Sequence, residues 1–79
     1  MTITVYSKPG CGQCIATTRT LDKEGIEYIY KDMSVDPEAH AEAVALGYMQ
    51  APVIVAGDQH WSGFRPDKIV ELASALKAA

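Results

Sequence analysis

Two cysteines separated by only two residues, directly after a short apolar run, constrain this chain more than any other feature. Cys11 and Cys14 are the only cysteines in the 79 residues. Residues 2–7 alternate apolar and polar side chains, which is typical of a β-strand. Residues 8–10 (Lys-Pro-Gly) predict a loop, and a helix is expected from about residue 12 to residue 24. The sequence therefore predicts sulfur chemistry where a strand passes into a helix.

Length and composition predict one small domain over residues 1–79. The formal net charge of −3 and the lack of a Lys/Arg cluster argue against nucleic-acid binding. No run of apolar residues is long enough to span a membrane, and no basic segment precedes an apolar one as in a secretory signal. We therefore expect a cytoplasmic protein, and a monomer because no large unpaired apolar face is apparent.

The remaining elements follow from apolar patterns and from turn or cap residues. Gly25 is expected to cap the first helix, and Asp36 with Pro37 to open the second, which ends near Leu46. Further strands are expected at residues 26–31, 52–56 and 60–62, and a last helix starts at residues 65–67 with an apolar stripe of Ile69, Leu72, Ala73 and Leu76. The order is βαβαββα. Strands joined through a helix should be parallel and those joined by a tight turn antiparallel, which predicts an α/β fold with a four-stranded mixed sheet flanked by three helices in three layers.

The helix start gives the first cysteine a specific chemistry. There its sulfur would face unpaired backbone N–H groups and the positive end of the helix dipole, which favours a thiolate with a pKa of roughly 3.5–7.5. Lys8 would add positive charge, and Gly12 has no side chain to cover Cys11. Cys14 lies one turn further and should be buried against the sheet. The Cys11 thiolate would attack a substrate disulfide, and Cys14 would then attack Cys11 and release the reduced substrate.

Two other interpretations of the cysteine pair remain open, an inert pair and part of a zinc site. A zinc site needs three or four ligands. His40 and His60 are the only histidines and belong to different predicted elements, and His60 is expected to be a surface residue at a strand end. A redox role is therefore favoured. On the first helix, Cys14 should share one face with Thr17 and Leu21.

Ala51 and Pro52 stand at the start of the third predicted strand. An X-Pro bond is cis in only about 5–6% of cases in folded proteins, so the residues alone predict a trans bond. A cis bond would turn the Ala51 backbone toward the cysteines, where its N–H and C=O could pair with an extended substrate peptide.

Residues 61–66 (Trp-Ser-Gly-Phe-Arg-Pro) allow two interpretations. Trp61 could belong to the core while Phe64 packs against the start of the last helix. Alternatively, Trp61 and Phe64 form a docking surface beside the cysteines. Met33 and Met49 are expected to be packing residues.

Over its whole length the chain resembles the thioredoxin fold in its short, glutaredoxin-like form, and more closely the NrdH-redoxins. Three stretches carry this resemblance, of which the last is the most specific: residues 11–14 (Cys-Gly-Gln-Cys), 46–53 (Leu-Gly-Tyr-Met-Gln-Ala-Pro-Val) and 61–67 (Trp-Ser-Gly-Phe-Arg-Pro-Asp). The resemblance implies a cis Pro52 and a bacterial or phage dithiol–disulfide oxidoreductase, with Cys11 as nucleophile and Cys14 as resolving thiol. It implies no bound cofactor or metal beyond the redox-active disulfide.

The resemblance also implies the partners. The substrate would be class Ib ribonucleotide reductase, through cysteines on the C-terminal tail of its large subunit. Electrons would come from NADPH through thioredoxin reductase. The expected partner-binding residues are Lys8, Gly12, Gln13, Ala51, Pro52, Trp61 and Phe64.

One departure and two rival functions accompany the resemblance. Gly12 stands where the family usually has a larger residue, often valine. A glutathione-dependent glutaredoxin would have a Gly-Gly turn and an acidic pair at the last helix start, whereas this chain has residues 56–58 (Ala-Gly-Asp), a single Asp67 and the bulky Trp61. An iron–sulfur or metal carrier would use Cys11 from two chains to hold a shared cluster.

Overall fold

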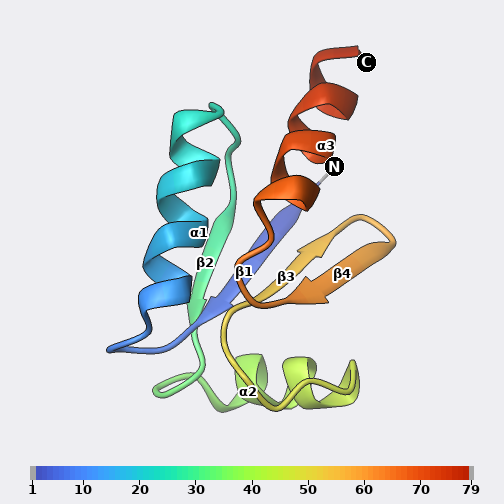
Figure 1. Cartoon of the computed structure of the whole chain (residues 1–79). Helices are drawn as coiled ribbons and strands as arrows, with labels where there is room; N and C mark the ends of the chain where they lie inside the picture. Colours follow the sequence, from blue (N-terminus) through green and yellow to red (C-terminus); the bar gives the residue numbers. More distant parts are fainter. Residues whose placement is uncertain (1, 79) are drawn as a thin grey trace.

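The computed structural model describes residues 2–78 (Figure 1). The strand that leads into the cysteine loop, β1 (Ile3–Ser7), is an interior strand of its sheet. The strand order is β2-β1-β3-β4. β2 (Ile29–Asp32) pairs parallel with β1, while β3 (Val53–Ala56) pairs antiparallel with β1 and with β4 (Gln59–Ser62). The mixed four-stranded sheet predicted from the sequence is confirmed.

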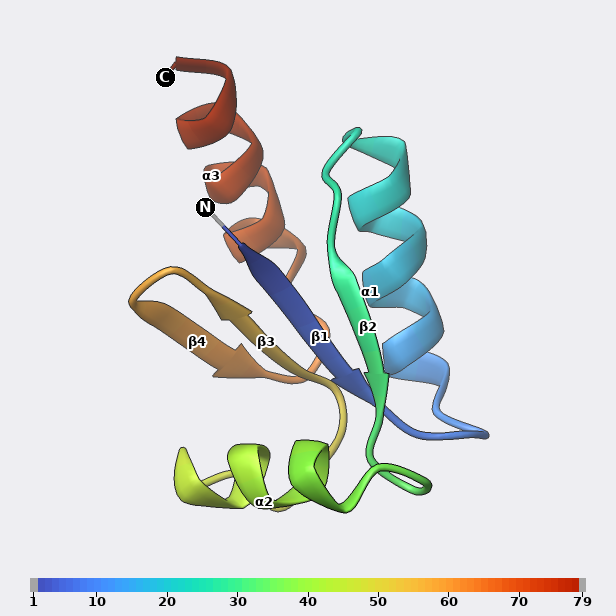
Figure 2. The same cartoon turned by 180° about the vertical axis from the view of Figure 1, so that it is seen from behind.

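The three helices cover both faces of this sheet. α1 (Gly12–Lys23) and α3 (Pro66–Ala78) lie on one face, and α2 (Pro37–Ala45) lies across the other (Figures 1 and 2). This is the predicted three-layer arrangement.

The alternation along the strands divides the core between the two faces. Ile3 and Val5 of β1 face α1 and α3, and Tyr6 faces α2. The larger cluster contains Ile3, Val5, Leu21, Ile26, Ile54, Ala56, Trp61, Ile69, Leu72 and Ala73, and the smaller contains Tyr6, Ala39, Ala43 and Val53. Leu76 of the predicted α3 stripe is 37% exposed, because the last turns of α3 extend past the sheet (Figure 1).

The end of α1 explains why β2 starts later than predicted. Gly25 has a positive φ of 70°, its N–H donates to the Asp22 carbonyl (3.1 Å), and the N–H of Ile26 donates to the Leu21 carbonyl (2.9 Å). This is the Schellman arrangement that closes a helix. Ile26 is buried as part of the cap, so pairing with β1 begins only at Ile29.

The start of α2 is as predicted. The Asp36 carboxylate accepts two backbone N–H bonds, and Pro37 occupies the first helical position. α2 is tied to the sheet by Glu42, which accepts bonds from Lys31 (3.1 Å) and from the Tyr6 hydroxyl (3.3 Å). Burial, followed by the Glu42 charge, raises the pKa of Tyr6, so its hydroxyl stays protonated as the donor.

The two methionines that were expected to be packing residues differ in their burial. Met33 packs against the smaller core cluster, as predicted. Met49 does not, because 83% of its surface is exposed on the segment between α2 and β3. The prediction for Met49 was therefore wrong, since a loop residue has no neighbouring element that must cover it.

Candidate active site

Cys11 occupies the N-cap position of α1, as the sequence predicted. Its backbone is extended (φ −102°, ψ 104°), and its sulfur accepts a hydrogen bond from the backbone N–H of Cys14 at 3.0 Å. The two cysteines form a disulfide with their Cα atoms 5.2 Å apart. The same N–H and helix dipole would stabilise a thiolate on Cys11 in the reduced protein.

Both cysteines are largely enclosed in this oxidised form. Cys14 is 3% exposed and shares the buried face of α1 with Thr17 and Leu21, as predicted. Cys11 is 9% exposed, which is less than expected for the attacking residue. In this form the Cys11 sulfur is held against the first turn of α1 by the disulfide and by the N–H of Cys14.

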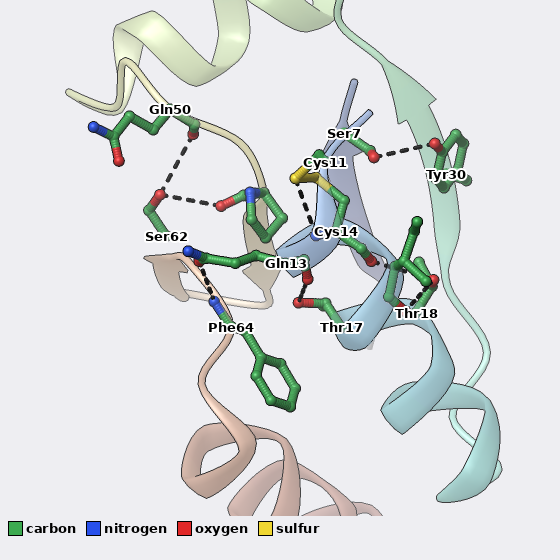
Figure 3. The surroundings of a disulfide bond; sticks show 12 residues. Ser7, Cys11, Gln13, Cys14, Thr17, Thr18, Tyr30, Gln50, Ser62 and Phe64 are labelled. Atoms are coloured by element: carbon green, nitrogen blue, oxygen red, sulfur yellow. Dashed lines mark hydrogen bonds between the residues drawn. A yellow bond between two sulfur atoms is a disulfide. The ribbon is translucent and has the colours of Figure 1, made fainter. Parts of the chain in front are cut away.

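The Ala51–Pro52 peptide bond is cis. The trans bond predicted from residue statistics was therefore wrong, and the expectation from the family resemblance is confirmed. The carbonyl of the buried Pro52 accepts bonds from the Gly63 N–H (2.9 Å) and the Ser62 hydroxyl (3.1 Å). The same hydroxyl lies 3.4 Å from the Gln50 carbonyl (Figure 3). This segment is thereby held to the end of β4, beside the disulfide.

Gln13 joins the first turn of α1 to the loop before α3. Its side-chain oxygen accepts the backbone N–H of Phe64 at 3.1 Å (Figure 3). Phe64 is partly buried against the larger core cluster, and Trp61 is inside that cluster at 6% exposure. The burial of Trp61 supports its interpretation as a core residue, whereas contact of Gln13 or Phe64 with a partner stays a prediction.

Substitution of Gly63 tests this junction. Gly63 has a φ of +86°, and a Cβ there would lie 3.2 Å from the Gln13 side-chain oxygen. We expect Gly63→Ala to lower the free energy of unfolding by about 1–2 kcal/mol, because an L-residue is strained in this conformation. Urea unfolding of the oxidised protein measures this free energy.

Gly12→Ala is the matched control. Gly12 is helical, has no positive φ, and a Cβ there would meet open space. The free energy of unfolding of this variant should therefore stay the same or rise by up to about 1 kcal/mol. Equal stability of the two variants would contradict the expectation.

Lys8 lies between the cysteines and the cis-proline segment. It lines a hollow of about 210 Å³ together with Cys11 and Cys14, and a second one of about 250 Å³ together with Ala51. Of the predicted site residues, Lys8 lines the hollow of the cysteines, Gly12 and Gln13 lie in the first turn of α1, and Phe64 is hydrogen-bonded to Gln13. Ala51 lines the second hollow with Lys8, Pro52 is hydrogen-bonded to Ser62 and Gly63, and Trp61 is buried in the core. Contact of these residues with a partner stays a prediction.

Two further residues beside the cysteines were not predicted from the sequence. Ser7 is 1% exposed, and its hydroxyl accepts a hydrogen bond from the Tyr30 hydroxyl at 3.1 Å (Figure 3). Both line the hollow that the cysteines share. A signal was present in the sequence for Ser7, a polar residue at the carboxyl end of a strand and directly before the cysteine loop, where sites in α/β sheets usually lie.

Neither histidine lines the hollow that contains the two cysteines. His60 is exposed on β4, with its Nδ1 atom 2.7 Å from the Tyr48 hydroxyl, so its prediction as a surface residue is confirmed. Among residues 2–78, no group of three or more His, Cys, Asp or Glu side chains is placed to hold a metal ion. Within the same part of the chain, no helix has the length and apolar character needed to cross a membrane.

Comparisons with known proteins agree with this geometry. The glutaredoxin family model matches residues 3–61. The glutaredoxin-like proteins NrdH of Salmonella typhimurium and Escherichia coli K12 are 42% and 43% identical over 79 residues, covering 100% of this chain and 98% of each relative. The solved NrdH-redoxin of Escherichia coli superposes with a TM-score of 0.87 at 43% identity, covering 91% of this chain and 95% of that one. A glutaredoxin of Archaeoglobus fulgidus gives a TM-score of 0.74 at 25% identity, covering 89% and 83%.

Proposed function

The chain belongs to the glutaredoxin family, with NrdH glutaredoxin-like proteins as full-length relatives, and from this we propose that it carries electrons from thioredoxin reductase to ribonucleotide reductase. Its chemistry is that of a thiol–disulfide oxidoreductase. The observation that carries the proposal is the N-cap position of Cys11, whose sulfur accepts the Cys14 N–H, with the buried Cys14 within disulfide reach. The C-terminal tail of the reductase's large subunit would present the substrate disulfide.

The two cysteines divide the reaction between them. The Cys11 thiolate attacks one sulfur of the substrate disulfide, and the other substrate sulfur leaves as a thiolate. Cys14 then loses its proton and attacks the Cys11 sulfur, which forms the Cys11–Cys14 disulfide and releases the second substrate thiolate. Two electrons pass to the substrate. Thioredoxin reductase returns two electrons from NADPH to the protein disulfide, and we place this cycle in the cytoplasm, with the protein acting as a monomer.

The start of α3 supports thioredoxin reductase over glutathione as the electron source. Arg65 binds both oxygens of the Asp67 carboxylate, at 3.2 and 2.9 Å, and this hydrogen bonding lowers the pKa of Asp67. A glutathione-dependent glutaredoxin would have two acids here, whereas this chain has one, and that one is paired with Arg65 at the surface. The bulk of Trp61 gives no support either way, because it points into the core. The solved Escherichia coli relative is described as having a thioredoxin-like activity profile, which also favours this source.

Reduction of the oxidised protein with two electron sources in parallel tests the proposal. NADPH consumption is followed with thioredoxin reductase in one reaction, and with glutathione plus glutathione reductase in the other. We expect fast turnover with thioredoxin reductase alone, and then transfer to ribonucleotide reductase. Turnover with glutathione alone would make the protein a glutathione-dependent glutaredoxin instead. Activity with neither source would favour an iron–sulfur or metal carrier.

A further inference from the structure

We propose that Tyr48 and His60 are positioning residues, which fix the cis-proline segment in place for an extended substrate and so set the affinity of the protein for peptide disulfides. The cis-proline segment is residues 48–52, which lead from the end of α2 into β3. Neither side chain lines the hollow that contains the cysteines. The inference rests on the proposed function, because it takes the backbone of Ala51 as the group that pairs with the substrate.

The backbone of Ala51 is free to bind another chain. Among residues 2–78, no hydrogen bond within the protein uses its N–H or its C=O. The next carbonyl, that of Pro52, accepts from the Gly63 N–H at 2.9 Å. The carbonyl of Gln50, on the other side, lies 3.4 Å from the Ser62 hydroxyl (Figure 3). A peptide can pair with a single exposed residue only if the neighbouring backbone holds that residue in a fixed place.

Side-chain packing does not fix the middle of the cis-proline segment. Met49 is 83% exposed, and Gln50 is exposed as well. On the side of α2, a hollow of about 250 Å³ is lined by Ala43 and Val44 together with residues 48–51, so the helix does not pack closely against them. The position of Ala51 therefore depends on the hydrogen bonds that hold the segment to its neighbours.

Tyr48 ties the start of the segment to two different elements. Its backbone N–H donates to the Ala43 carbonyl at 3.1 Å, across the end of α2, and its ring packs against the smaller core cluster. Its hydroxyl lies 2.7 Å from Nδ1 of His60 and 3.3 Å from the His60 carbonyl. The two rings meet edge to face, with their centroids 5.5 Å apart. The hydroxyl thereby joins the segment to the edge strand β4.

The alternation along β4 explains why His60 is available for this contact. Trp61 turns into the larger core cluster on the face of α1 and α3, so its neighbours His60 and Ser62 turn toward the face of α2, where the cis-proline segment runs. Ser62 contacts the carbonyls of Gln50 and Pro52. The contact of Tyr48 with His60 adds the hold at the start of the segment, so β4 fixes the backbone on both sides of Ala51.

The contact does not require one protonation state of His60. When Nδ1 carries no hydrogen, the Tyr48 hydroxyl donates to it. When Nδ1 is protonated, it donates to the Tyr48 oxygen, and the hydroxyl hydrogen is free to turn toward the His60 carbonyl. The pair therefore acts as a fixed tie between the segment and β4.

Single-turnover oxidation of the reduced protein tests this role without any protein partner. The probe is a synthetic peptide with blocked ends, in which two cysteines close to one another form a disulfide. Bis(2-hydroxyethyl) disulfide is the matched substrate, because it has no peptide group that can pair with Ala51. Reactions with excess disulfide are stopped with acid, and mass spectrometry measures the oxidised protein. The dependence of the rate on concentration gives a half-saturating concentration and a limiting rate.

Tyr48→Phe removes the hydroxyl and keeps the ring against the smaller core cluster. With the peptide, we expect the half-saturating concentration to rise about 3- to 10-fold, the size of one hydrogen bond, while the limiting rate is unchanged. With bis(2-hydroxyethyl) disulfide, the rates should be those of the wild type. Addition of His60→Ala to Tyr48→Phe should cause no further loss, because the two side chains form one contact. His60→Asn should keep the wild-type affinity, since its side-chain oxygen replaces Nδ1 as acceptor.

Tyr28→Phe is the matched control, because its hydroxyl donates to Asp22 at 3.1 Å, near the end of α1 that is remote from the cysteines. It should leave both substrates unaffected. The positioning role is overturned if Tyr48→Phe keeps the wild-type half-saturating concentration for the peptide, if both disulfides are affected by the same factor, or if Tyr28→Phe has the same effect. Failure of the wild-type protein to react with either disulfide would contradict the proposed function itself, so the two failures are distinguishable.

Discussion

Replacing Cys14 by serine is expected to stop the reaction half-way, with the substrate held on Cys11 as a mixed disulfide. The Cys11 sulfur keeps its position at the N-cap of α1, so the first attack still occurs. A serine hydroxyl is close in size to a thiol but cannot form a disulfide, so nothing releases the substrate. Turnover with thioredoxin reductase should fall on the order of 10⁴-fold, since the two groups act as a unit. Mass spectrometry should find one substrate peptide per protein, removable by a dithiol reductant.

Cys11→Ser is the companion variant for this experiment. It should lose turnover to the same extent but accumulate no adduct, because the buried Cys14 cannot reach an incoming disulfide. Full turnover of Cys14→Ser would show that the two-thiol mechanism is wrong. An adduct on Cys11→Ser would reverse the proposed roles of the two cysteines.

The fold was predictable where a local signal and the tertiary structure agree. Asp36 followed by Pro37 specifies a helix start through hydrogen bonds made within three residues, and α2 begins there. Ile26 is the opposite case. A β-branched residue in an apolar run predicts a strand, but its N–H is used by the cap of α1. Local composition cannot show that the N–H of Ile26 already donates to the Leu21 carbonyl at the end of α1 and so cannot pair with a neighbouring strand.

The candidate site was predictable in its sulfur chemistry and less so in its surroundings. Helix geometry alone was enough to place these two residues: Cys11 at the N-cap of α1 and Cys14 one turn further along the helix. Ser7 and Tyr30 meet only because β1 and β2 pair in parallel with one particular register, which no local pattern gives. The burial of Trp61 likewise depends on which face of β4 turns toward α3.

Replacing Leu21 by alanine should have the largest effect on stability. Leu21 is 0% exposed in the larger core cluster, on the helix that carries both cysteines. A Leu→Ala change at such a site costs about 2–5 kcal/mol, from lost burial and from the cavity that remains. A domain of this length has a total stability of only about 4–12 kcal/mol. We therefore expect a large fall in the urea concentration at the midpoint of unfolding. Circular dichroism of the oxidised protein during urea unfolding measures this midpoint.

Leu76→Ala separates this effect from the general cost of shortening a leucine. Leu76 is on α3 and 37% exposed, so its loss removes less buried area than the loss of Leu21 and leaves no enclosed cavity, and it should cost only about 1 kcal/mol. Alanine is favourable in either helix, so the difference between the variants reports packing and not helix propensity. If Leu21→Ala lost no more stability than Leu76→Ala, α1 would not be held in place by the larger core cluster. The position of the cysteines would then depend on the hydrogen bonds at its first turn, above all the one from Phe64 to Gln13.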